Sequence, residues 1–199
     1  MGKILYEFLR IIFSFILTVF FRWKVTGLDN IPKQGGVLIC ANHISNLDPP
    51  VIATAVPRAL HYMAKEELFR LWGFGQIIRN LNAFPVRRGS ADRTAIRTAL
   101  GLLIAGKVVG IFPEGTRSKT GILGNPEPGV SLIAARAGVP IIPTAITGTN
   151  QIFCNGTILP QITIRFGRPI SVEQGKIDKE SLELLSQTIM TEISNLLKG

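Results

Sequence analysis

A histidine and an aspartate five residues apart form the first group of side chains that could carry out chemistry. His43 and Asp48 lie in segment 42–50, directly after the apolar run 37–41. On a continuous helix, residues with this spacing lie about 140° apart around the axis, so a turn must bring the two side chains together. A carboxylate that accepts the proton of one imidazole nitrogen fixes the tautomer and leaves the other nitrogen free as a base. Such a base could take the proton of a substrate hydroxyl, which then attacks an acyl carbonyl.

Each of these two residues also has a simpler interpretation. Pro49 suits the first turn of a helix, and Asp48 would then be the N-cap residue of that helix. His43 could be a histidine whose hydrogen bonds are satisfied within a loop. These residues alone leave both alternatives open.

A second group of polar residues follows another apolar run. Segment 112–118 reads FPEGTRS. Gly115 permits an unusual turn, and Thr116 and Arg117 offer hydroxyl and guanidinium donors to an oxyanion. The alternative is a solvated turn at the end of a strand.

A third apolar run, 83–87, ends in the basic pair Arg87 and Arg88. Such a pair could also consist of solvated surface residues that only keep the protein soluble. However, polar loops that follow the strands of an α/β sheet usually meet at one edge, where such folds bind their ligands. We therefore expect the three loops to share one site.

The elements that must position these groups have the pattern of an α/β domain. Short apolar runs predict strands at 36–41, 60–64, 83–87, 108–112, 140–146 and 162–166. Helical periodicity predicts helices at 49–56, 66–79, 91–105, 129–137 and 179–197. We expect one α/β domain over residues 25–199, in which helices flank a central mixed sheet.

The N-terminal segment differs from the rest of the chain. Residues 4–21 are apolar except for four positions. The uninterrupted part, 11–21, would be a helix about 17 Å long, which is short of a hydrocarbon core of about 30 Å. The segment also lacks the small-residue cleavage site of a signal peptide. We expect residues 1–24 to form a monotopic anchoring helix in one leaflet, on the cytoplasmic face of the cell membrane.

A second amphipathic segment, 68–78, has aromatic and aliphatic side chains interleaved with Arg70 and followed by Arg79. Packing in the core and a flap that faces the membrane are both compatible with it.

The overall composition narrows the classes of function. The chain has 199 residues with 22 Lys and Arg against 13 Asp and Glu, so its net charge is +9. That charge favours anionic partners. Because recognition helices and RNA-binding motifs are lacking, we expect an anionic membrane surface and a phosphorylated substrate, and no nucleic acid. Cys40 and Cys154 lack the spacing of metal ligands, so we expect reduced core cysteines and no metal site.

Four segments, in their order along the chain, resemble the sequence blocks of the glycerolipid acyltransferase family. They are 42–48, 84–88, 112–118 and 139–143. The resemblance extends from residue 25 to about residue 168 and implies an acyltransferase domain. It implies that an acyl group moves from a thioester of acyl carrier protein or coenzyme A to the sn-2 hydroxyl of lysophosphatidic acid. The product would be phosphatidic acid, and no metal or cofactor would be required.

The same resemblance implies roles for individual residues. His43 would be the general base, and Asp48 would orient it. The glycerol phosphate would be held by residues of the second and third blocks, namely Arg87, Glu114, Gly115, Thr116 and Arg117. Two alternatives remain: a sibling enzyme acting on glycerol 3-phosphate or another lysophospholipid, and a basic membrane-binding protein without enzyme activity.

Overall fold

The fold is built on a seven-stranded mixed sheet. The structure is a computed structural model that describes residues 2–87, 92–154, 158–172, 174 and 178–199. In this part of the chain the strand order is β1-β7-β6-β2-β5-β3-β4. All neighbouring strands are parallel except β6 and β7, which confirms the predicted mixed sheet. The strands are β1 (Lys24–Thr26), β2 (Val37–Ala41), β3 (Leu60–Lys65), β4 (Ala83–Val86), β5 (Val108–Ile111), β6 (Ile141–Thr147) and β7 (Thr163–Phe166).

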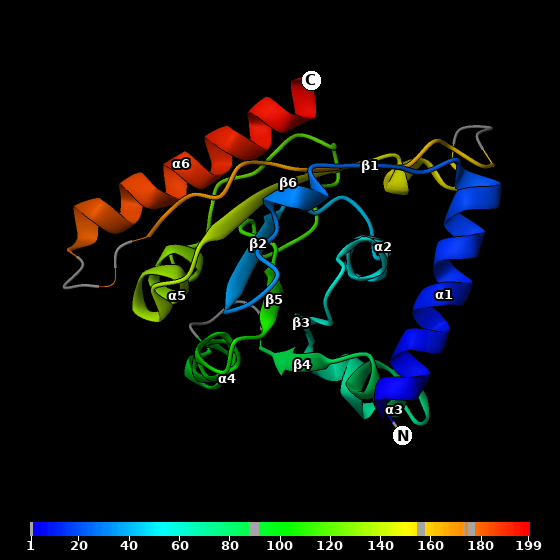
Figure 1. Ribbon diagram of the computed structural model, residues 1–199, viewed down its shortest axis with the longest axis horizontal. Coiled ribbons are helices and arrows are strands. Elements are labelled where there is room, and N and C mark those ends of the chain that lie inside the picture. Colours follow the sequence, from blue (N-terminus) through cyan, green and yellow to red (C-terminus); the bar gives the residue numbers. More distant parts are fainter. Residues whose placement is uncertain (1, 88–91, 155–157, 173, 175–177) are drawn as a thin grey trace.

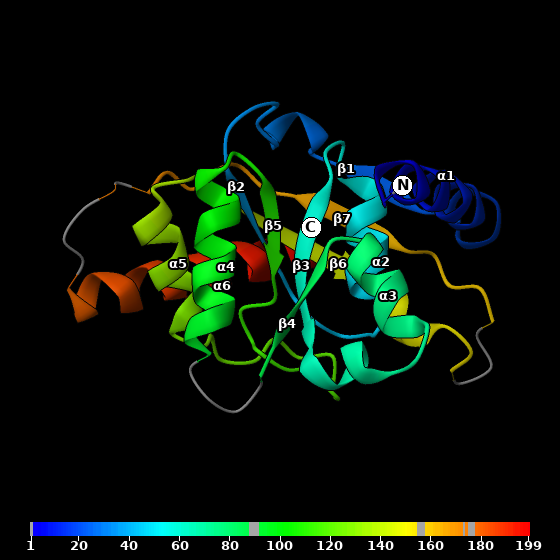
Figure 2. The same cartoon turned by 90° about the horizontal axis from the view of Figure 1, so that it is seen from below.

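Helices cover both faces of this sheet (Figures 1 and 2). The α-helices are α1 (Gly2–Phe21), α2 (Asp48–Ala55), α3 (Phe74–Asn80), α4 (Arg93–Ile104), α5 (Gly129–Ala137) and α6 (Lys179–Lys198). Three short 3-10 helices are η1 (Leu28–Asn30), η2 (Glu66–Arg70) and η3 (Thr149–Gln151). In Figure 1, α4, α5 and α6 lie on one side of the sheet, and α1 and α2 lie on the other.

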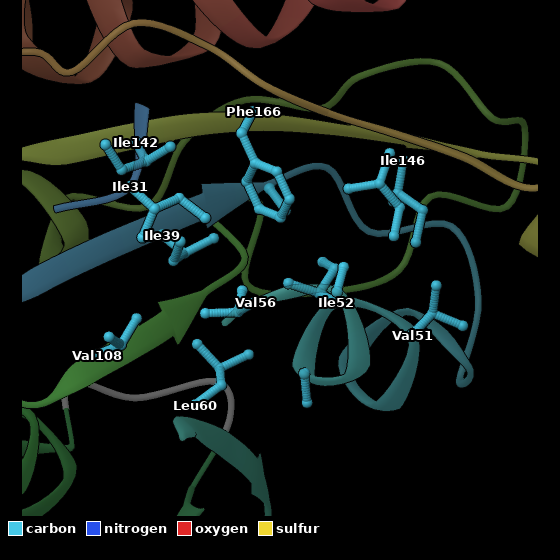
Figure 3. Packing of buried hydrophobic residues seen from close by; sticks show 14 of the residues in the cluster. Ile31, Ile39, Val51, Ile52, Val56, Leu60, Val108, Ile142, Ile146 and Phe166 are labelled. Atoms are coloured by element: carbon cyan, nitrogen blue, oxygen red, sulfur yellow. The ribbon is translucent and has the colours of Figure 1, made fainter. Parts of the chain in front are cut away.

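Alternating side chains of the central strand divide the core into two clusters. In β2, Val37 and Ile39 belong to the cluster under α1 and α2, whereas Leu38 and Cys40 belong to the cluster under α4, α5 and α6. Successive side chains of a strand point to opposite faces, so a strand buried on both sides is apolar throughout. Figure 3 shows the first cluster, in which residues of α2 pack together with residues of the sheet.

The predicted strands agree with the structure to within a residue or two at each end. The short strand β1 was not predicted. The predicted helix 66–79 is wrong as a single element, because Gly73 has φ +74° and separates η2 from α3. The start predicted at residue 91 lies outside the described residues. Cys40 is a buried thiol as expected, but Cys154 is exposed, so its assignment to the core is wrong.

Helix α1 lies along the domain and is attached to it near both ends. Tyr6 is buried, and its hydroxyl lies 3.4 Å from the carbonyl oxygen of Ala53 and accepts the N–H of Leu60 at 3.2 Å. Leu17 is buried in the cluster under α1 and α2. These two contacts are about 17 Å apart along the helix axis.

The opposite side of α1 is an apolar stripe that faces away from the domain. It consists of the exposed residues Ile4, Phe8, Ile11 and Phe15. Segment 4–21 has a mean hydropathy of 2.0 and is long and apolar enough to cross a membrane, judged by length and composition alone.

Candidate active site

His43 and Asp48 form a buried pair at the end of β2. Nδ1 of His43 lies 2.9 Å from Oδ2 of Asp48, and only 5% and 0% of the two side chains are exposed. Because the carboxylate oxygen accepts this hydrogen bond, the ring proton is on Nδ1, and Nε2 can accept a proton. Within the described residues, Nε2 has no hydrogen-bond partner. The loop between the two residues supplies the turn that their spacing requires.

The loop wraps around the Asp48 carboxylate. Oδ2 also accepts the backbone N–H groups of Ile44 and Ser45, both at 2.7 Å. Oδ1 accepts the hydroxyl of Thr149 at 2.6 Å. Asp48 is itself the first residue of α2, and the residue before it makes no side-chain capping bond. The interpretation of Asp48 as a helix cap is therefore wrong, because both carboxylate oxygens turn back to the loop and to Thr149.

The backbone of His43 is held by the loop that follows β5. Its N–H donates to Oε1 of Glu114 at 2.8 Å, and its carbonyl accepts the N–H of Ser118 at 2.8 Å. Its ring stacks on Phe112 with a centroid distance of 4.0 Å and an interplanar angle of 17°. The first and third sequence blocks thus meet at one sheet edge, since β2 and β5 are parallel neighbours.

The residues of the third block differ in their exposure. Glu114 is buried, and its second carboxylate oxygen accepts the N–H of Gly124 at 2.8 Å. Gly115 has φ +66°, and a Cβ atom there would lie 2.9 Å from Cγ of Glu127, so glycine is required. The side chains of Thr116 and Arg117 are exposed.

An open polar hollow of about 380 Å³ lies at this loop. Its lining includes Glu114, Thr116 and Ser118. Hydroxyl and backbone groups thus line a space large enough for a small polar headgroup. A narrow apolar recess lies nearby, next to the ring of Phe112, and is lined on its other sides by Pro49, Ile52 and Tyr62.

Arg87 lies apart from the His43 pair. It follows β4, which is three strands from β2 in the sheet, a separation of about 14 Å. Its Nε atom lies 3.8 Å from a carboxylate oxygen of Glu66 and 3.8 Å from one of Asp92, and its side chain is 68% exposed. Arg88 lies outside the described residues. The structure thus brings His43, Asp48 and Glu114 together and leaves Arg87 at the far end of the same edge.

Comparison with known proteins agrees with this architecture. The family model for acyltransferases matches residues 22–147. The chain belongs to the acyltransferase family. The 1-acyl-sn-glycerol-3-phosphate acyltransferase of Bacillus subtilis is 32% identical to it over 148 residues, covering 74% of this chain and 73% of that protein. The protein of the same name from Streptococcus pneumoniae is 31% identical over 191 residues, covering 90% and 70%.

A solved structure has the same fold. It is the 1-acyl-sn-glycerophosphate acyltransferase PlsC from Thermotoga maritima, which matches with a TM-score of 0.72 at 28% identity. The match covers 98% of this chain and 79% of that one. The predicted acyltransferase domain is thereby confirmed.

In the sequence analysis, Asn42 is part of the first block without a role in the candidate site, and Thr149 is not singled out. The side chain of Asn42 exchanges two hydrogen bonds, of 2.9 and 2.8 Å, with the backbone of Ile146 and so ties the end of β2 to β6. Thr149 binds Asp48. Both follow predicted strands, so a systematic inspection of every strand end would have included them.

Proposed function

We propose that this acyltransferase transfers a fatty acyl group from a thioester to the sn-2 hydroxyl of 1-acyl-sn-glycerol 3-phosphate, forming phosphatidic acid. The proposal rests on the buried His43–Asp48 pair with a free Nε2, in a chain whose relatives are named for this acceptor. A general base next to an open polar hollow is what the attack of a lipid hydroxyl on a thioester requires.

The reaction proceeds by direct transfer. Nε2 of His43 removes the proton of the acceptor hydroxyl as its oxygen attacks the thioester carbonyl. The C–O bond forms, the C–S bond breaks, and the departing thiolate receives the proton from the imidazolium. Asp48 holds the ring in the productive tautomer and stabilises the imidazolium during the step.

The phosphate of the acceptor is held at the loop after β5. Arg117 and Thr116 supply exposed charged and hydroxyl donors beside the hollow, and Gly115 allows the turn that presents them. Glu114 contributes indirectly. Its carboxylate accepts the backbone N–H groups of His43 and Gly124, so it holds the end of β2 next to the loop that lines the hollow. Arg87 adds positive charge at the far end of the edge.

The acyl donor is a thioester of acyl carrier protein or coenzyme A. Both carry negative charge, which suits a chain of net charge +9. Phe112, which stacks on the His43 ring, offers apolar surface next to the reacting groups.

Residues 1–24 anchor the enzyme to the cytoplasmic face of the membrane, and residues 25–199 carry the chemistry. Helix α1 is attached to the domain by Tyr6 and by Leu17, so it lies along the domain and exposes its apolar stripe over its length. A helix bound in this way favours insertion into one leaflet over a perpendicular span. The acceptor lipid then reaches His43 without its chain crossing water.

The test is an assay of the purified enzyme with several acceptors and both donors. We expect thiol release with lysophosphatidic acid and a new acyl chain at the sn-2 position, located by cleavage with phospholipase A2. The variant His43→Ala should lower turnover by at least 10²-fold, the lower range for a lost general base, whereas His61→Gln should retain activity. A clear preference for glycerol 3-phosphate or a neutral lysophospholipid would overturn the proposed acceptor, and an active His43→Ala enzyme would overturn the mechanism.

A further inference from the structure

Thr149 makes the one contact, among the described residues, that joins the Asp48 carboxylate to a part of the chain outside its own loop. Its hydroxyl donates to Oδ1 of Asp48 at 2.6 Å, and the two residues are 101 positions apart. Both are buried, with exposed fractions of 2% and 0%. The three donors to Oδ2 instead come from His43, Ile44 and Ser45, which belong to the same loop.

The position of Thr149 is set by the backbone and does not depend on Asp48. Thr149 follows Gly148, which has φ +89° and whose Cα lies against the backbone carbonyl of Gln161. A Cβ atom at position 148 would overlap that carbonyl, so glycine is required there. The carbonyl of Gly148 accepts the N–H of Gln151 and closes the first turn of η3. These backbone contacts hold Thr149 in place directly after β6.

The two oxygens of Asp48 therefore have different partners. The donors to Oδ2 belong to the loop and would move together with it. The donor to Oδ1 is the first residue of η3, which follows β6, and the parallel pairing of β6 with β2 places it at the same edge of the sheet as His43. Rotation about the Cβ–Cγ bond moves both oxygens, so a carboxylate with partners at both is more restricted than one with partners at a single oxygen.

We propose that Thr149 is a positioning residue, which sets the orientation of the Asp48 carboxylate and so holds His43 in its Nδ1-protonated tautomer. The part of this inference that concerns turnover rests on the proposed function. The part that concerns the tautomer does not.

Removal of the Thr149 hydroxyl leaves the Asp48 carboxylate with partners at one oxygen only. The carboxylate is then less restricted, so the imidazole spends less time in the productive orientation and kcat falls. The KM values change little, because the substrates do not contact Thr149.

The test compares three variants with the wild-type enzyme. Thr149→Val removes the hydroxyl at nearly constant volume, and Thr149→Ser keeps it. Thr144→Val is the matched control, because Thr144 is also buried in β6 but its hydroxyl bonds to the carbonyl of Ile142 at 3.2 Å, away from Asp48. We expect Thr149→Val to lower kcat about tenfold with little change in KM, as for other residues that orient a functional side chain. Thr149→Ser should restore kcat, and Thr144→Val should leave it unchanged.

Coupling to Asp48 distinguishes positioning from a general loss of structure. In an Asp48→Asn enzyme, Thr149→Val should lower kcat less than twofold further, because the carboxylate through which it acts is already gone. An equal tenfold loss in both backgrounds would overturn the proposal. So would a Thr149→Val enzyme with unchanged kcat.

Nitrogen NMR of the histidine side chains tests the inference without any substrate. The chain has only two histidines, so His61→Gln assigns the His43 signals. In the wild type we expect the shifts of a single tautomer with the proton on Nδ1, and in Thr149→Val we expect a mixture of tautomers. If the two proteins differ in this way but the wild type has no activity with lysophosphatidic acid, the proposed function fails and the role of Thr149 stands. A single tautomer in both proteins overturns the role of Thr149.

Discussion

His43 and Glu114 are joined by a hydrogen bond of 2.8 Å between the backbone N–H of the histidine and Oε1 of the glutamate. The same carboxylate accepts the N–H of Gly124 through Oε2. Glu114 thus connects the strand end that carries His43 to the loop that lines the hollow. A buried carboxylate whose oxygens already accept backbone N–H groups serves chiefly to fix these two segments.

Replacement of Glu114 by glutamine should therefore affect turnover more than acceptor binding. The amide retains one acceptor oxygen but turns its NH2 group toward a backbone N–H, which leaves a buried donor without a partner. We expect a loss of about 1–3 kcal/mol in the free energy of unfolding. We also expect a larger fall in kcat than rise in the KM of the acceptor, measured well below the melting temperature. A selective rise in acceptor KM would instead assign Glu114 to direct contact with the substrate.

Replacement of Arg117 should affect acceptor binding more than turnover, which is the opposite of the result expected for Glu114. Arg117 is exposed and lies between Thr116 and Ser118, two residues that line the hollow. If it binds the acceptor phosphate as proposed, Arg117→Ala removes a charge-assisted contact to that substrate. We expect the KM of lysophosphatidic acid to rise about tenfold or more while the KM of the thioester changes little. Arg136→Ala, at an exposed arginine on α5, is the control for lost surface charge. A change confined to the thioester KM would mean that Arg117 binds the donor.

The central part of the fold could be predicted because of the physics of buried parallel strands. Strands such as β2 are covered on both faces, so they read as uninterrupted apolar runs. Strand β1 gave no such signal, because it has only three residues and pairs with β7, far away in the sequence. The break between η2 and α3 depends on the backbone conformation of Gly73, which the apolar periodicity does not record.

The candidate site was also predicted only in part. The spacing of His43 and Asp48 after a strand indicated a turn that joins them, and the structure has it. Thr149 was not predicted, because a threonine after Gly148 fits an ordinary turn. Its contact with Asp48 exists only because β6 pairs with β2. Local sequence therefore indicated the His43–Asp48 pair, whereas the contact between Asp48 and Thr149 depends on the order of the strands.

His61 should make the stability of the fold depend on pH. Burial lowers the pKa of this imidazole below its ordinary value of 6.5, backbone groups of Val108 and Ala59 offset part of this effect, and the nearby Lys107 lowers the pKa further. Within the part of the chain that the structure describes, its Nδ1 atom has no hydrogen-bond partner. The unfolded chain therefore takes up a proton near pH 6.5, whereas the folded chain does so only at lower pH. The contribution of neutral His61 to the free energy of unfolding is fully present above pH 6.5. It declines as the pH falls toward the pKa of His61 in the folded protein.

Urea unfolding at several pH values tests this linkage. We expect the free energy of unfolding of the wild type to fall between pH 7 and pH 5, and His61→Gln to flatten that part of the curve. Asp178→Asn is a useful comparison, because a hydrogen bond from the Ser181 backbone lowers the pKa of Asp178 and its effect belongs to the range below about pH 4. An unchanged slope in His61→Gln would assign the dependence to other groups.

The apolar stripe of α1 should control membrane binding without affecting the fold. Deletion of residues 1–22 would also remove Tyr6 and Leu17, which are buried against the domain, so point variants on the outer face are the sharper test. Ile11 and Phe15 are 65% and 64% exposed on that face. Each side chain contributes about 1.5–3 kcal/mol when it is buried in an apolar medium. The double variant Ile11→Ser/Phe15→Ser should therefore bind vesicles at least tenfold more weakly, at an unchanged melting temperature.

A second apolar surface should add to this binding. The segment that joins η2 to α3 exposes Leu71 and Trp72, and Phe74 follows at the start of α3. Figures 1 and 2 both place α3 near the N-terminal end of α1, and residues of the two helices are in contact. Trp72→Ser should therefore weaken binding further when it is combined with the α1 variants. Ile104→Ser is the matched control, because Ile104 is 73% exposed but lies on α4, across the sheet.

Cosedimentation with vesicles of phosphatidylglycerol and phosphatidylcholine, at low and high salt, separates the two contributions to membrane binding. High salt should weaken binding by screening basic residues such as Arg22 and Lys24, but it should leave the apolar part, which the serine variants remove. The same variants should lose activity on vesicle-embedded lysophosphatidic acid and retain it on a short-chain soluble acceptor, because His43 and Asp48 are unchanged. Equal losses on both acceptors would mean that the stripe supports the fold. If labelling placed the start of α1 on the opposite side of the bilayer from the domain, the helix would span the membrane and the one-leaflet anchor would be wrong.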